Sequence, residues 1–225
     1  MGRWLVICVV LGGCGQLLGI DDLDERPPCF ADSFTVLDPA RWAFTRDPSV
    51  VDVDLIEGSV VISPPPNLAG NEVENGIATV DTLDLTDATL TVTVHTQSSP
   101  ELLQTFFLFD IQLGTGFGFI TGDGKLNART FTNGVDSNVP PLDFDPLKIF
   151  WRLRHDSERA SIIFEISANL VDWDPIRVAS GYPAPLLGTA RLQGGVYVAP
   201  SADPGKAVFD AIELASDSCI SASAD

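Results

Sequence analysis

Two acidic segments of this 225-residue chain hold carboxylates close enough in sequence to act together on a substrate. The segment DVDLIE contains Asp52, Asp54 and Glu57, and the segment NEVE contains Glu72 and Glu74. A pair of carboxyl groups can hydrolyse a glycoside when both project from one face. On a strand, Glu57 points away from Asp52 and Asp54, and NEVE lies among glycines and asparagines. We therefore expect solvated acidic surface at both segments.

Other catalytic constellations are absent from the sequence. His95 and His155 are the only two histidines, and neither lies in a cluster with metal-ligand spacing. The segment TGDGKL (121–126) predicts a hairpin turn, because it lacks the strand-to-helix context of a phosphate loop. No GxSxG nucleophile motif occurs. We accordingly expect a protein that is not an enzyme.

The first residues have the pattern of an export signal. A basic leader precedes the apolar run Trp4–Leu11, which is shorter than the about 20 residues that span a bilayer. Residues 11–14 (LGGC) resemble the lipobox of bacterial lipoproteins, in which the cysteine, here Cys14, carries the lipid. The resemblance implies a signal peptide at 1–13 and membrane contact through the lipid anchor only. The alternative is a buried N-terminal strand in which Cys8 and Cys14 are small hydrophobic residues.

The expected organisation after the signal is a tether, one domain and a tail. Residues 14–28 are acidic, lack periodicity and end in two prolines, which is typical of a solvated tether. The domain extends over 29–220, and 221–225 form the tail. Gly15 follows the lipobox cysteine in place of an inner-membrane retention aspartate. The resemblance therefore places the protein in the bacterial cell envelope and favours the outer membrane.

The charge of the mature chain restricts its partners. The full chain has 13 basic and 31 acidic residues, a formal net charge of −18. Removal of Arg3 with the signal leaves 12 basic residues and changes the net charge to −19. Such an acidic chain excludes nucleic acid and anionic lipid surfaces as partners and favours cations or neutral ligands such as sugars. The sequence identifies no protein partner.

Two cysteines remain near the two ends of the domain, Cys29 and Cys219. In an oxidising compartment this pair predicts a disulfide worth about 4–5 kcal/mol in the chain-entropy model. The disulfide requires the first and last strands to be neighbours. The alternative is two free thiols whose segments never meet.

The sequence of the domain predicts β-strands over nearly its whole length. ATLTVTVHT (88–96) alternates apolar residues with threonines, and KIFWRLRHD (148–156) places Trp151 and Leu153 on one face and Arg152 and Arg154 on the other. Turn signals separate the segments, and no stretch has a convincing helical period. The pattern predicts an all-β fold, a two-sheet antiparallel β-sandwich of the jelly-roll type.

Four segments resemble the successive signatures of concanavalin A-like lectin/glucanase domains. They are FADSFTVLDPARWAF (30–44), IEGSVVI (56–62), WRLRHDSERASIIFEISANLVDWDPI (151–176) and KAVFDAIEL (206–214). The resemblance implies a concanavalin A-like jelly-roll and a carbohydrate ligand. Glucanases of this superfamily carry their catalytic acids on one central strand. The nearest match here, 52–57, runs directly into a turn, so the resemblance supports a non-catalytic module.

The resemblance also implies a structural calcium ion on the convex sheet. In related proteins an aspartate of the closing strand and backbone carbonyls near the first strand and first turn bind the cation. These positions correspond to Asp210, the carbonyl of Gly58 and a carbonyl near Ser33. Oxygen ligands and an acidic chain suit calcium. The alternative is that Asp210 only bonds a neighbouring loop.

Four polar residues are candidates for contacting a sugar: Asp110, Gln112, Arg152 and Arg154. Sugar binding needs aromatic surface beside polar groups that reach hydroxyls. Most of the aromatic residues are expected in the core of a sandwich. The alternative for the two arginines is cross-strand pairing with Glu165.

These observations predict a membrane-anchored lipoprotein that displays a non-catalytic, lectin-like module for carbohydrate or glycoconjugate. The alternative is a structural or adhesive envelope protein that binds another protein. A divergent glycoside hydrolase is the third hypothesis, and two carboxylates facing one groove would support it.

Overall fold

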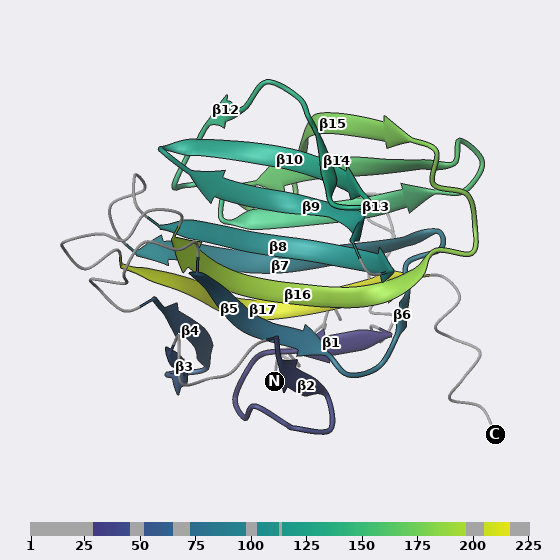
Figure 1. The fold of residues 1–225 in the computed structure, drawn as a ribbon. Helices are drawn as coiled ribbons and strands as arrows, with labels where there is room; N and C mark the ends of the chain where they lie inside the picture. Colours follow the sequence, from purple (N-terminus) through teal and green to yellow (C-terminus); the bar gives the residue numbers. More distant parts are fainter. Residues whose placement is uncertain are drawn as a thin grey trace, which may run out of the picture.

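The computed structural model describes residues 29–45, 52–64, 73–97, 103–112, 114–196 and 205–216. In these ranges the chain forms strands and no helix, arranged in two antiparallel sheets packed face to face (Figure 1). This confirms the predicted all-β sandwich. Helices suited to crossing a membrane are accordingly not found in this part of the chain. The strands are β1 Phe30–Asp32, β2 Trp42–Phe44, β3 Asp52–Ile56, β4 Ser59–Ser63, β5 Val73–Thr79, β6 Leu83–Asp84, β7 Ala88–Gln97, β8 Gln104–Gln112, β9 Thr115–Gly122, β10 Lys125–Thr132, β11 Val135–Asn138, β12 Leu142–Asp143, β13 Phe150–Asp156, β14 Ser161–Ser167, β15 Asp174–Ser180, β16 Leu187–Val196 and β17 Lys206–Ser216.

Each sheet mixes strands that are distant in sequence. The eight-stranded sheet has the order β15-β14-β13-β7-β17-β4-β3, with β1 paired to β17. The nine-stranded sheet has the order β11-β10-β9-β8-β16-β5-β2, with β12 paired to β10 and β6 paired to β16. Consecutive strands such as β8, β9 and β10 form hairpins, whereas β16 returns from late in the chain to pair with β8. The order brings early and late segments of the sequence onto one face.

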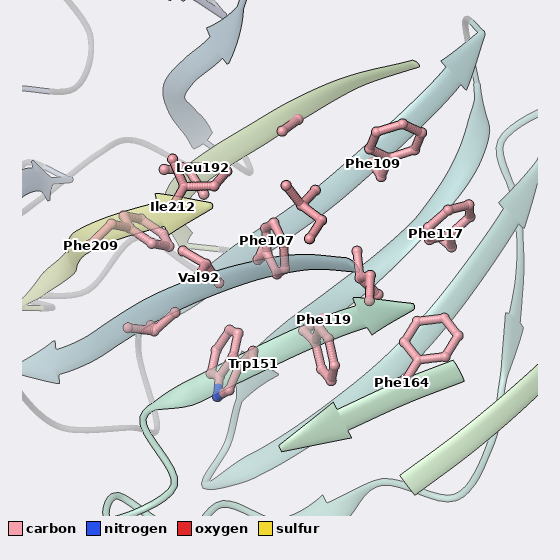
Figure 2. Packing of buried hydrophobic residues seen from close by; sticks show 14 of the residues in the cluster. Val92, Phe107, Phe109, Phe117, Phe119, Trp151, Phe164, Leu192, Phe209 and Ile212 are labelled. Carbon is pink, nitrogen blue, oxygen red and sulfur yellow. The ribbon is translucent and has the colours of Figure 1, made fainter. Parts of the chain in front are cut away.

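The core lies between the sheets and is rich in aromatic residues (Figure 2). Alternation along β8 turns Phe107 and Phe109 inward, and β9 turns Phe117 and Phe119 inward. The Phe119 ring lies 5.6 Å from Trp151 of the opposite sheet, centroid to centroid. The residues between these inward positions, Leu108 and Gly118, therefore point to the outer side of the nine-stranded sheet, where both are still buried.

Arg177 of β15 connects the two sheets at one edge of the sandwich. Its guanidinium donates to the carbonyls of Ala128 at 2.7 Å and Ser137 at 2.9 Å, and to Thr130 Oγ1 at 3.1 Å. These acceptors belong to β10 and β11. One side chain thus satisfies three acceptors of the opposite sheet.

The start of the domain lies beside its last strand. The Cys29 N–H donates to the Leu214 carbonyl at 2.8 Å, and β1 pairs with β17. This is the neighbourhood that the predicted disulfide requires. Cys219, the predicted lipidation site Cys14, and the predicted signal, tether and tail lie outside the described residues.

Candidate functional site

An ion pair between Asp110 and Arg191 lies on the outer face of the nine-stranded sheet. Asp110 is near the end of β8, and Arg191 is on the adjacent strand β16, whose Thr189 is directly opposite Asp110. Arg191 Nη2 donates to Asp110 Oδ1 at 2.9 Å, and Arg191 Nε contacts Oδ2. A bulge after Asp110 shifts the register against β9. Bulges re-aim side chains, which suits a functional position.

The pair borders a hollow of about 520 Å³. Apolar surface makes up most of its wall, and the lining residues are Thr82, Asp110, Ile111, Gln112, Gly114, Phe131, Leu187, Gly188, Thr189 and Arg191. A Cβ on Gly188 would lie 2.3 Å from the Asp110 carbonyl oxygen, so only glycine fits beside Asp110 here. A hollow of this size with convergent polar groups is suited to a small polar ligand or part of a longer one.

The pKa of Asp110 is raised above the ordinary carboxyl value of 3.8. Burial is the main cause, since it disfavours the charged form. The charge of Arg191 and its hydrogen bond oppose the rise in pKa, and the negative charge of Glu74 adds to the rise. Asp110 is therefore a carboxyl group that holds its proton to higher pH than an exposed aspartate does.

The strand β9, which neighbours the central strand β8, supplies no carboxylate to this face. Its outward positions are Gly116, Gly118 and Ile120, alternating with the inward Phe117 and Phe119. A Cβ on Gly116 would lie 2.8 Å from the Phe131 ring, and one on Gly118 would lie 2.9 Å from the Leu108 side chain. The two neighbouring side chains thus cover the glycines. With Phe106 and Ile120 they form an apolar cluster on the outer face.

A second hollow of about 280 Å³ lies toward the other end of the same strands. Its lining is mostly polar: Gln104, Ile120, Thr121, Gly122, Asp123, Asn127 and Arg129. Arg129 Nη2 forms an ion pair with Asp136 of β11. The outer face of the nine-stranded sheet therefore has two hollows, the first with a mostly apolar wall and the second with a mostly polar one.

The four residues predicted to contact a sugar do not form one site. Asp110 and Gln112 both line the first hollow, whereas Arg152 and Arg154 lie on β13 in the eight-stranded sheet. The structure shows the cross-strand alternative for the arginines. Arg152 Nε donates to Glu165 Oε2 at 2.8 Å, and Arg154 Nε lies 3.3 Å from the same oxygen.

Arg152 also stacks on Trp173. The guanidinium carbon lies 3.8 Å from the ring centroid, a cation–π contact. The contact fixes both side chains on the outer face of the eight-stranded sheet. Both arginines thus have partners within the protein.

The three residues predicted to bind calcium come together at one end of the eight-stranded sheet. A Cβ on Gly58 would lie 3.8 Å from the Ser33 carbonyl oxygen. Asp210 accepts from Ser59 Oγ at 2.8 Å, and its other oxygen lies 2.6 Å from His95 Nε2. In the described ranges no group of three or more acidic, histidine or cysteine side chains could hold a metal. Asp210 and these carbonyls give fewer oxygens than the six to eight that calcium takes, so water would have to complete the shell.

The acidic segments predicted to be surface lie apart from the Asp110 hollow. Asp52 and Asp54 are on β3, at the edge of the eight-stranded sheet, and Glu57 is in the turn to β4 with a φ of +53°. Glu72 lies outside the described residues. Glu74 is on β5, in the same sheet as Asp110. Glu74 was expected to be a solvated surface carboxylate, and Arg191 was not among the predicted site residues.

Comparisons with solved structures identify the fold. A β-1,3-1,4-glucanase (lichenase) from a mouse hindgut metagenome is similar over 83% of this chain and 98% of its own, with a TM-score of 0.58 and 14% identity. A β-1,3-glucanase from Mycobacterium marinum is similar over 84% of this chain and 99% of its own, with a TM-score of 0.62 and 13% identity. The Bacillus licheniformis β-glucanase is similar over 83% and 97%, with a TM-score of 0.58 and 12% identity. The sandwich is thus of the concanavalin A-like type expected from the sequence.

Comparison by sequence gives no match. No protein-family model matches the chain, and no curated protein matches it.

These neighbours contradict the expected function. We expected a lectin-like module that is not an enzyme, because no strand reproduced the acidic pattern of glucanases. The three solved structures named above, which share the fold, are described as β-glucanases. The expectation considered only carboxylates along one strand, whereas burial in the folded sheet, with a contribution from Glu74 on another strand, raises the pKa of Asp110.

Proposed function

We propose that this chain is a divergent glycoside hydrolase that acts on a β-linked glucan at the Asp110 hollow. The observation that carries the proposal is the partly buried carboxyl group of Asp110, with its raised pKa, at a hollow on the outer sheet face. The fold shared with β-glucanases supports the substrate class.

We assign the proton-donor role to Asp110, whose burial raises its pKa, although the charge of the facing Arg191 opposes the rise. Cleavage of a glycosidic bond requires a proton on the leaving oxygen, so the donor must be protonated at working pH. Burial favours the protonated form of Asp110. Arg191 keeps the carboxyl group in place through Nη2 and stabilises the carboxylate left after proton transfer.

Glu74 on β5 is a second acidic residue on this sheet, and its role is limited to its electrostatic effect on Asp110. Its charge raises the pKa of Asp110, so the two groups interact electrostatically. The strand register places Glu74 opposite Gly195 and Asp110 opposite Thr189, at separate points along β16. Six residues of a strand span about 20 Å, which is wider than the about 5–5.5 Å of retaining enzymes and the about 6.5–9.5 Å of inverting enzymes. The register therefore does not support Glu74 as the catalytic base.

Release of reducing sugar from β-1,3-1,4-glucan and β-1,3-glucan tests the proposal. We expect the wild type to hydrolyse at least one of them and Asp110→Asn to lose about 10²-fold or more of the rate, the contribution typical of an acid catalyst. Asp143→Asn, which changes an exposed aspartate on β12, is the matched control and should keep full activity. Full activity of Asp110→Asn, or no activity of the wild type on either glucan, would refute the assignment.

The anchoring and cross-linking predictions remain proposals alongside this function. We propose a lipoprotein anchored through Cys14 in the bacterial envelope, with a disulfide between Cys29 and Cys219. Proximity of Cys29 to β17 supports the disulfide. Loss of lipid labelling in Cys14→Ser tests the anchor, and thiol titration of the unfolded, unreduced chain tests the disulfide.

Calcium at Asp210 is a further proposal. The carboxylate of Asp210 and the carbonyls of Gly58 and Ser33 would hold the ion, and binding would replace the contacts of Asp210 with Ser59 and His95. A rise in melting temperature with calcium that Asp210→Asn abolishes would support it, and an unchanged melting temperature would refute it.

A further inference from the structure

Two arginines of β13 share one carboxylate on the outer face of the eight-stranded sheet. Arg152 Nε donates to Glu165 Oε2 at 2.8 Å, whereas Arg154 contacts the two oxygens of Glu165 only at 3.3 and 3.4 Å. The Glu165 side chain is 7% exposed, and the Arg154 side chain is 41% exposed. Two positive charges and one negative charge leave a net charge of +1 on this group. The excess positive charge lies on the side that faces solvent.

Several guanidinium N–H groups of these arginines can still bind a ligand. Among the described residues, Arg152 donates only through Nε, and Arg154 donates through Nε and Nη2. Both terminal nitrogens of Arg152 and Nη1 of Arg154 therefore have no acceptor in that part of the chain. Thr91 and Thr89 of β7 lie directly opposite Arg152 and Arg154 and are partly exposed. Their hydroxyl groups can donate to and accept from a ligand beside the guanidiniums.

Trp173 is held next to Arg152 by a fixed loop. Asn169 Oδ1 accepts from the Asp172 N–H at 2.9 Å, and Trp173 Nε1 donates to the Leu170 carbonyl at 3.0 Å. The Arg152 guanidinium stacks on the indole ring, and Trp173 remains partly exposed. Because the aromatic surface is in place before a ligand arrives, the ordering cost of binding is low.

The charges around this group leave its excess positive charge in place. The adjacent ion pairs on the same sheet are each balanced: Lys148 with Asp174, and Arg159 with Asp156. Glu213 of β17 is separated from Arg152 by β7, which corresponds to about 10 Å at ordinary strand spacing. This distance exceeds the Debye length of about 8 Å at physiological salt, so solvent screens most of the interaction. The group is therefore a local positive site on a chain of net charge −18.

The chemistry of this site indicates the kind of ligand that it fits. A planar carboxylate matches the fork of a guanidinium, and its single negative charge balances the net charge of +1. A phosphate monoester carries about 1.5 to 2 negative charges and would be only partly neutralised. A partly exposed indole ring beside hydroxyl groups suits a pyranose ring. Both features are combined in a sugar that carries a carboxylate.

We propose that Arg152, Arg154, Thr91 and Trp173 form a binding site for an acidic sugar, a hexuronic acid residue, on the face of the sandwich opposite the Asp110 hollow. The carboxylate binds the two guanidiniums, and the pyranose ring contacts Trp173. This site is separate from the proposed hydrolytic site and acts without cleaving its ligand.

Calorimetry at pH 7 with trigalacturonate and with tetraglutamate tests the inference. We expect trigalacturonate to bind the wild type, and Arg154→Gln to weaken the binding about tenfold or more, the loss typical of a hydrogen bond between charged groups. Glu165→Gln should strengthen the binding, because the carboxylate that competes for the guanidiniums is removed. Arg154 is 41% exposed, so its replacement leaves the core intact.

Arg159→Gln is the matched control, since it removes the same charge from an 80% exposed arginine in the turn after β13. It should change the affinity less than about twofold. Absence of trigalacturonate binding, or an equal loss in Arg159→Gln and Arg154→Gln, would overturn the inference. Equally tight binding of tetraglutamate would assign the site to acidic peptides instead and would also overturn it. None of these measurements uses hydrolysis, so inactivity on glucans would refute the proposed function and leave this inference standing.

Discussion

Replacing Arg191 by methionine should destabilise the protein more at neutral pH than at acid pH. The substitution keeps most of the side-chain length but removes the cation that faces Asp110. Removing one partner costs about 3–5 kcal/mol for a buried ion pair, and exposed pairs are worth about 0–1 kcal/mol. The Arg191 and Asp110 side chains are 26% and 20% exposed. Because the pair is between these two limits, we expect Arg191→Met to lower the free energy of unfolding by about 1–3 kcal/mol at pH 7.

The sign of the pH dependence follows from the raised pKa of Asp110. The native state holds this proton more tightly than the unfolded state, so the contribution of Asp110 to stability falls as pH rises from 3.8 through the native pKa. Without Arg191 the pKa of Asp110 in the native state rises further, so the loss of folding stability grows as the pH rises. As pH falls below 3.8 the carboxyl becomes increasingly protonated in both states, and the effect of Arg191→Met should shrink to under about 1 kcal/mol.

Urea unfolding of four proteins measures this effect: wild type, Arg191→Met, Asp110→Asn and the double variant. In the Asp110→Asn background, Arg191→Met should cost little at any pH, because the carboxylate is absent. A cost of Arg191→Met that is the same at pH 3.5 and pH 7, or the same with and without Asp110, would refute the electrostatic reasoning.

Three further changes test other contacts. Glu74→Gln should lower the pKa of Asp110 and move the alkaline limb of the activity profile to lower pH, and an unchanged profile would exclude electrostatic coupling. Gly118→Ala should destabilise the protein by about 1–3 kcal/mol in thermal unfolding, because its Cβ would lie 2.1 Å from the Phe107 carbonyl oxygen. Arg177→Met should lower the free energy of unfolding by about 1–3 kcal/mol, because the carbonyls of Ala128 and Ser137 lose their donor. Wild-type stability of this variant would contradict the role of Arg177 between the sheets.

The outward-facing polar residues illustrate what local patterning predicts. Arg152 and Arg154 were expected on one face of a strand, and both lie on the outer face of β13. Asp110 and Gln112 were proposed as sugar contacts and line one hollow. Alternation in the sequence assigns a face to each residue, but it does not say which sheet carries that face. The division of these four residues between two sheets could not be predicted.

The ion-pair partner of Asp110 shows why the site could not be predicted from the sequence. Arg191 is 81 positions away in sequence, and β16 pairs with β8 only through the strand order of the nine-stranded sheet. Glu74 comes from a third strand on the far side of β16. Since a carboxyl pKa depends on burial and nearby charge in space, no local motif could predict the raised pKa of Asp110.

The sequence by itself determined the all-β class, the sandwich and the inward aromatic residues, because period-two alternation depends only on neighbouring residues along the chain. It also determined the strong negative charge. Only the tertiary structure decided which outward residues meet, since strand order and register join β5, β8 and β16 across long loops. The hollow at Asp110 results from that pairing. Asp110 could therefore be identified as the candidate acid only from the folded sheet.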